Sequence, residues 1–209
     1  MATDLLLPLM DLPGVAESVT SARERVDALL WDRSLRTKGA ALRKDVAIQN
    51  ARASAAIDGI DIALSAWVTG DAFDDSPIGH AAAGVWRLEQ SLPEQVNVWA
   101  VAPMQSLARM HSLVARDVVA DADRLGRPRD SEEVDDPLRI KSLPDAASMK
   151  VRLAGLAQVT TTPTEAPAIV QAAVVHGELV ALRPFEWAVD SFLGRVRCRG
   201  GQVEHRPTP

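Results

Sequence analysis

The chain has 209 residues, 47% of them hydrophobic, and its formal net charge is -5. This acidic balance argues against a non-specific nucleic-acid binder, and a single cysteine, Cys198, rules out an internal disulfide framework. No apolar run reaches the ~20 residues that span a bilayer, and Pro8 interrupts the apolar stretch near the N-terminus, so we expect no membrane partner and no secretory signal. We expect a cytoplasmic protein with one domain and a helical extension.

The first third of the chain has helical periodicity. Apolar residues recur at spacings of three and four from residue 15 to residue 30, which predicts a helix that Gly39 ends. A second helix is predicted over 40–57, because Asp58-Gly59 then supplies a stop signal. A short helix is expected around 63–68.

The middle of the chain continues in the same way. The spacing predicts helices over 78–92 and 103–122. Residues 126–145 carry several prolines and many charges, so this segment is predicted to be a loop or a short β-hairpin. The pattern returns to helical over 146–159.

A strongly apolar helix follows. Thr164 is predicted to cap it, and Glu165 would then lie in its first turn, where the helix dipole favours an anion. The helix is expected to end before Pro184 and to be the most buried one. After it, residues 194–209 form an Arg-, Gly- and Pro-rich tail with little to bury. The fold class predicted from these patterns is all-α.

Three segments stand out, in this order: Ser54-Ala55-Ala56-Ile57-Asp58-Gly59, Gly126-Arg127-Pro128-Arg129 and Leu182-Arg183-Pro184-Phe185-Glu186. Together they resemble motifs of the Fic (Fido) family, most closely its divergent actinobacterial-type members. The first is similar to the family's inhibitory [S/T]xxxE[G/N] motif, with Asp for Glu, and the second to the G-x-x-R start of its flap. The third is similar to the start of its active-site motif HPFxxGNGRxxR. The resemblance covers roughly residues 15–187.

The resemblance implies a Fic-like helical bundle with an inhibitory-type N-terminal helix and a short β-hairpin flap. The implied parts are an N-terminal extension over 1–60, a core over 61–193 and an irregular tail over 194–209. The implied activity is protein adenylylation, in which AMP moves from ATP to a protein hydroxyl with Mg²⁺ as the metal. A target protein would lie along the flap at 126–145.

The resemblance also assigns roles to individual residues. Arg183 takes the place of the family's catalytic His, and Glu186 takes the place of the acidic Mg²⁺ ligand. The implied nucleotide-binding residues are Arg183, Phe185 and Arg195. The implied inhibitory residues are Ser54, Asp58 and Gly59.

The chain departs from the family pattern where the phosphates would bind. Arg183 has no accessible neutral form, so it cannot act as a general base near neutral pH. Residues 188–191 read Ala-Val-Asp-Ser in place of Gly-Asn-Gly-Arg, which removes the glycines and the cation of a phosphate-binding loop. Two explanations stay open: a degenerate Fic protein, or a reading frame disrupted near residue 187.

Other functions, and purely structural roles for the same residues, stay open beside the adenylyltransferase hypothesis. The alternatives are a catalytically inactive Fic-fold binding or regulatory module and a truncated non-functional product. A helical DNA-binding regulator is disfavoured, because the charge is acidic and no basic recognition helix is present. Asp58-Gly59 is also explained as a helix-ending turn, and His111 and His176 as packed or hydrogen-bonded residues. The histidines show no metal-binding spacing, and each Trp is expected in a core or an interface.

Overall fold

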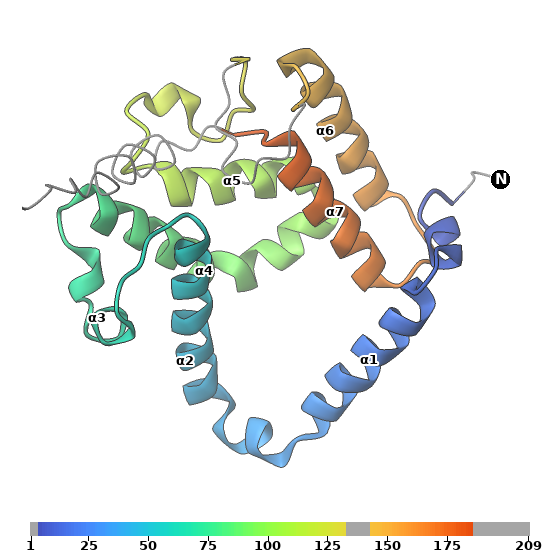
Figure 1. Ribbon diagram of the computed structural model, residues 1–209, viewed down its shortest axis with the longest axis horizontal. Coiled ribbons are helices and arrows are strands. Elements are labelled where there is room, and N and C mark those ends of the chain that lie inside the picture. Colours follow the sequence, from blue (N-terminus) through green and yellow to red (C-terminus); the bar gives the residue numbers. More distant parts are fainter. Residues whose placement is uncertain (1–3, 133–142, 186–209) are drawn as a thin grey trace, which may run out of the picture.

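The computed structural model describes residues 4–132 and 143–185 (Figure 1). These residues form helices and connecting turns and contain no strand, which confirms the all-α prediction for them. The helices are η1 (Leu7–Asp11), α1 (Val15–Trp31), α2 (Arg33–Ile57), α3 (Leu64–Thr69), η2 (Asp71–Phe73), α4 (Pro77–Val101), α5 (Pro103–Ala115), η3 (Ala122–Arg124), α6 (Ala146–Thr161) and α7 (Ala168–Leu182). Residues 133–142 of the segment predicted to be a loop or hairpin (126–145), and the whole tail, lie outside the described residues. In the described ranges no helix is long and apolar enough to cross a membrane.

The break between α1 and α2 falls at Asp32, where the backbone is extended (φ -64°, ψ 124°) and the amide donates to Leu29 O at 3.1 Å. The prediction that Gly39 ends the first helix is wrong, because Gly39 lies inside α2. One internal glycine costs a helix about 1 kcal/mol, which a helix of 25 residues tolerates. α2 does end at Ile57, and Gly59 adopts the predicted left-handed turn (φ 82°).

α4 extends beyond its predicted end at residue 92 and continues to Val101 with Pro93 inside it. Its start is fixed by Ser76, whose hydroxyl accepts the Gly79 amide at 3.0 Å. The helix stops at Ala102, whose φ of -143° is not helical, and α5 begins at Pro103, where a missing amide is tolerated. α5 ends at Ala115, earlier than predicted.

Two hydrophobic clusters form the core. The first joins α2, α3, η2 and α4 around the buried Trp67, and it consists of Ile48, Ala51, Ala55, Ile60, Trp67, Ala72, Ala81, Ala82 and Val85. The second joins α5, α6 and α7 and consists of Leu107, Met149, Leu153, Leu156 and Leu182. The prediction that α7 is the most buried helix is wrong, because within it Val170 and Leu182 alone are buried. α4, which lies between α2 and α5, holds more buried residues.

The N-terminus is tied to the loop between α6 and α7 by the carboxylate of Asp4. Its oxygens accept the Leu6 and Leu7 amides at 3.0 Å each, the Thr164 hydroxyl at 2.8 Å and the Glu165 amide at 2.8 Å. These bonds, that from the Glu165 amide above all, lower the pKa of Asp4 from 3.8 to about 2. The prediction that Thr164 caps α7 is wrong, because α7 starts at Ala168 after Pro167, and the Thr164 hydroxyl instead accepts the Ala166 amide at 3.0 Å in the loop before it.

Replacing Asp4 with Asn should flatten the acid limb of the stability profile. The Asp4 pKa is lower in the folded chain, so its contribution is present above pH 4 and is lost as the pH falls from about 4 to about 2. Thermal unfolding of both proteins at a series of pH values from 2 to 6 measures this. If Tm fell equally steeply with pH below pH 4 in both proteins, Asp4 would not be the source of this acid dependence.

Replacing Gly84 with Ala should destabilise the protein by roughly 2 kcal/mol. A Cβ at this buried position in α4 would overlap the backbone carbonyl of Val114 in α5, and overpacking of this kind costs ~1–3 kcal/mol. Gly155→Ala is the matched control. A Cβ at Gly155 on α6 meets nothing within 4 Å, so helix propensity should stabilise that variant by up to about 1 kcal/mol. Denaturant unfolding measures both, and an unchanged Gly84→Ala midpoint would contradict the prediction.

Candidate functional site

The C-terminal end of α7 turns sharply at Arg183. This residue has left-handed backbone angles (φ 43°, ψ 64°), and its amide donates to Leu179 O at 3.0 Å. A side-chain-bearing residue in this conformation costs about 1 kcal/mol or more, so surrounding contacts must hold it there. The buried Pro184 follows and prevents the helix from continuing.

The contacts that hold Arg183 in this turn come from Arg129, which is 3% exposed. All its described hydrogen bonds go to backbone carbonyls: from N to Pro184 O (2.7 Å), from Nε to Arg183 O (3.0 Å), from Nη1 to Ser131 O (2.8 Å), and from Nη2 to Pro144 O (2.6 Å) and Leu182 O (3.4 Å). A buried cation is tolerated only when its donors are bonded, and here carbonyl dipoles bond them. Arg129 thus joins the 126–131 segment and residue 144 to the last turn of α7.

His111, on α5, links the same two segments. Its ring is 8% exposed, its Nδ1 accepts the Gly126 amide at 2.9 Å, and it stacks on Phe185 with ring centroids 4.7 Å apart and planes 13° from parallel. Because a backbone amide can only donate, Nδ1 carries no proton in this arrangement, and the imidazole proton is on Nε2. Gly126 has a φ of 73°, which suits glycine. The prediction that His111 is a structural residue agrees with these contacts.

A cavity of about 380 Å³ lies beside this junction. Its wall is mostly apolar and draws on α2, α4, α5 and α7. It is lined by Ser54, Asp58, Val85, Leu88, Leu107, Met110, His111, Val114, Leu179, Pro184 and Phe185. Ser54 and Asp58 are therefore close to the end of α7 although more than a hundred residues separate them in sequence.

The predicted site residues divide into two groups. Ser54, Asp58 and Phe185 line the cavity, and Arg183 forms the turn at its edge. Glu186 and Arg195 lie outside the described residues. Sequence reasoning singled out Arg129 only as the last residue of a motif, and no local pattern reveals that its partners are carbonyls 53 and 54 positions away. His176 is exposed on α7, which contradicts packing, the first of the two structural roles (packed or hydrogen-bonded) predicted for it.

The described residues hold no group of three or more His, Cys, Asp or Glu side chains that could bind a metal ion. No family model matches the chain, and no curated protein or solved structure matches it either.

Replacing Arg129 with Lys should destabilise the protein by roughly 3 kcal/mol. Lysine has one donor group and cannot reach three separate carbonyls at once, so buried acceptors would be left unbonded at ~1–3 kcal/mol each. Arg127→Lys is the matched control, since Arg127 is exposed and should change stability by less than ~0.5 kcal/mol. Denaturant unfolding measures both, and equal midpoints would contradict the role given to Arg129.

Proposed function

We propose that this chain is a Fic-like protein, by descent a protein adenylyltransferase, and that the cavity at the end of α7 takes an adenine nucleotide. The observation that supports this proposal is the convergence of three separate motif-like segments. Ser54 and Asp58 line the cavity, Arg129 bonds the 126–129 segment to Pro184, and Phe185 closes the wall. Nothing in the local sequence requires these segments to meet.

The cavity suits the base of a nucleotide. Its volume of about 380 Å³ is within the ~300–1,000 Å³ of small-molecule sites, and its wall is apolar with few polar groups. Leu88, Met110 and Leu179 offer the apolar contacts that a planar purine needs.

The described lining suits the phosphates less well. Its one carboxylate, Asp58, would repel them, and no Lys or Arg lies among the described lining residues. By the resemblance, Glu186 would hold Mg²⁺, which neutralises phosphate charge when it is bound, and Arg183 would contact the nucleotide. The backbone of Arg183 is held in place by Arg129, whose side chain is occupied with carbonyls and therefore does not supply the missing cation.

Arg183 favours a second candidate function, a catalytically inactive binding or regulatory module. AMP transfer needs a base to take the proton of the target hydroxyl, and a guanidinium cannot do so near neutral pH. Binding without transfer is what this substitution predicts.

Thermal unfolding of the full chain with ATP and Mg²⁺ tests the binding step. Binding to the native state at 100 times Kd raises stability by ~2.7 kcal/mol, so we expect a clear rise in Tm. Ser54→Phe places a large ring from an exposed position into the cavity and should abolish the rise, while Ser65→Phe, at an exposed position on α3, should keep it. An unchanged Tm for the parent chain would contradict nucleotide binding.

Labelling with an ATP analogue tagged on the adenine then separates the two candidates. Transfer of label to a protein hydroxyl supports an active adenylyltransferase. Binding without transfer supports the inactive module.

A further inference from the structure

The ring of His111 joins α5 to two other parts of the cavity region. Its Nδ1 accepts the Gly126 amide at 2.9 Å, and its face stacks on Phe185 with ring centroids 4.7 Å apart. Among the described residues, the bond from Gly126 is the hydrogen bond that ties the 126–131 segment to α5. The bonds of Arg129 join the same segment to the end of α7 instead. His111 is therefore the α5 side of this junction.

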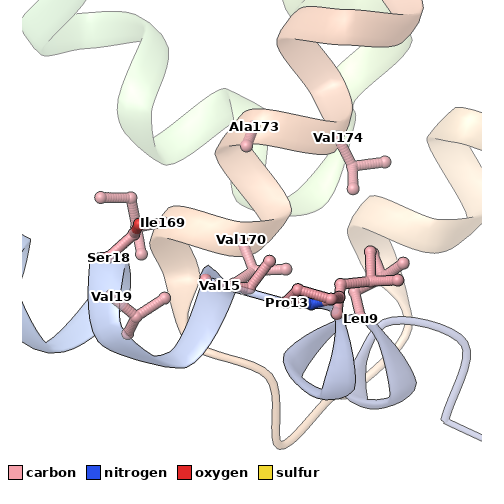
Figure 2. A pocket seen from close by; sticks show the side chains of 11 residues that line it. Leu9, Pro13, Val15, Ser18, Val19, Ile169, Val170, Ala173 and Val174 are labelled. Carbon is pink, nitrogen blue, oxygen red and sulfur yellow. The ribbon is translucent and has the colours of Figure 1, made fainter.

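Helix packing supports the meeting of α5 and α7 over a small region. α5 packs along α4, and α7 packs along α6. The start of α7 borders an apolar groove of about 640 Å³, where Val170 lies across from Val15 of α1 (Figure 2). α5 and α7 share the hydrophobic cluster that contains Leu107 and Leu182, and they share the junction at His111. A change in the state of His111 is therefore a change in how these two helices are joined.

The bond between His111 and Gly126 requires a neutral imidazole. A backbone amide can only donate, so Nδ1 must keep its lone pair, and the single proton of the ring is on Nε2. A second proton can bind only at Nδ1, where it would point at the hydrogen of the Gly126 amide. The ring is 8% exposed, so a cation at this place would also lose most of its solvation. Protonation thus replaces a hydrogen bond with repulsion.

Gly126 lies too close to α5 to absorb this change by a small shift. A Cβ at Gly126 would be 2.9 Å from Ala108 O and 3.0 Å from Ser112 Oγ, so the backbone passes directly over the helix. A protonated His111 therefore has to leave its place in the wall or push the 126–131 segment off α5.

The charged groups nearest the junction come from three elements. Asp58, on α2, lines the same cavity and attracts a cation. Arg129, in the 126–131 segment, and Arg183, at the end of α7, repel one. Two guanidinium groups against one carboxylate do not compensate for a buried imidazolium.

The remaining charged groups close to this part of α5 are paired. On α4, Arg87 pairs with Asp117 at 2.7 Å, and on α5 Arg109 bonds Glu94 at 3.4 Å. α4, α6 and α7 also contribute apolar side chains beside α5, which are Val85, Leu88, Met149, Leu153 and Leu179. The surroundings as a whole favour the neutral ring.

We propose that His111 is a proton-sensitive latch between α5 and the cavity wall at the end of α7. The neutral ring holds Gly126 and Phe185 and keeps the wall in place. The protonated ring releases the 126–131 segment from α5, while Arg129 keeps that segment on α7. An imidazole released to water takes up its proton near pH 6.5, so each pH unit below about 6.5 favours the open form about tenfold. The latch is measured without a nucleotide, so its test is separate from that of nucleotide binding.

Hydrogen exchange of the Gly126 amide, followed by NMR on the full chain, tests the latch. Its protection factor should fall roughly 25-fold from pH 7 to pH 5, because the open form binds a proton that the closed form excludes. At both pH values Gly126 should be less protected than Ala82, which is fully buried in α4 and is exposed only when the core opens. A protection factor that does not change with pH would overturn the proposal, and so would equal protection of the two amides.

His111→Gln is the matched variant for this measurement. The glutamine Oε1 can accept the Gly126 amide and does not titrate, so the protection factor should change by less than ~2-fold over the same range. His80→Gln is the control, because it removes a surface imidazole that bonds Asp75 and should leave the full pH dependence. Carboxylates do not interfere, since the lowered pKa values of Asp4 and Asp145 keep them ionised above pH 5. A pH dependence that persists in His111→Gln would overturn the role given to His111.

Nitrogen NMR of the imidazole in the parent chain tests the closed state and needs no variant. At pH 7 we expect an unprotonated Nδ1 and a protonated Nε2 for His111. A proton on Nδ1 at this pH would overturn the proposal even if His111→Gln failed to fold.

Discussion

The hydrogen bonds of the buried Arg129 are the constraint on which the candidate site depends. They hold carbonyls at the end of α7, in the 126–131 segment and at residue 144, three places that the chain leaves far apart. The left-handed turn at Arg183 is costly for a residue with a side chain, and these bonds offset that cost. Phe185 then reaches the ring of His111, and the cavity wall closes. Without Arg129, His111 alone among the described contacts would link the 126–131 segment to the end of α7.

The two ends of α7 have different surroundings. Leu182 belongs to the core formed with α5 and α6, so the C-terminal end of the helix is fixed and can build a site. Val170 and its neighbours near the other end face the groove beside α1, which the chain leaves open. The cavity lined by Leu179 and Phe185 and the apolar groove lined by Ile169 and Val170 are therefore at opposite ends of one helix.

Much of the local structure could be predicted from the sequence, because local signals set it. Asp58-Gly59 ends α2 with a left-handed glycine, and the 146–159 periodicity became α6. Predictions failed where a distant partner decided the outcome. Thr164 has the chemistry of a cap, but its hydroxyl donates to the distant Asp4 and accepts the Ala166 amide within the loop, and α7 starts at Ala168, after Pro167. The Gly39 prediction failed for a local reason, because a helix of 25 residues tolerates one internal glycine.

The sequence by itself determined the helical character of the described residues, the order of three motif-like segments, and an Arg at position 183 before Pro184 and Phe185. These follow from side-chain type and short spacings, which a linear chain carries. Only the tertiary structure decided that Ser54, His111 and Phe185 share one cavity and that the guanidinium of Arg129 bonds backbone carbonyls. A carbonyl is present at every residue, so no sequence pattern can say which ones a buried arginine will meet. That choice is made when helices distant in sequence pack together.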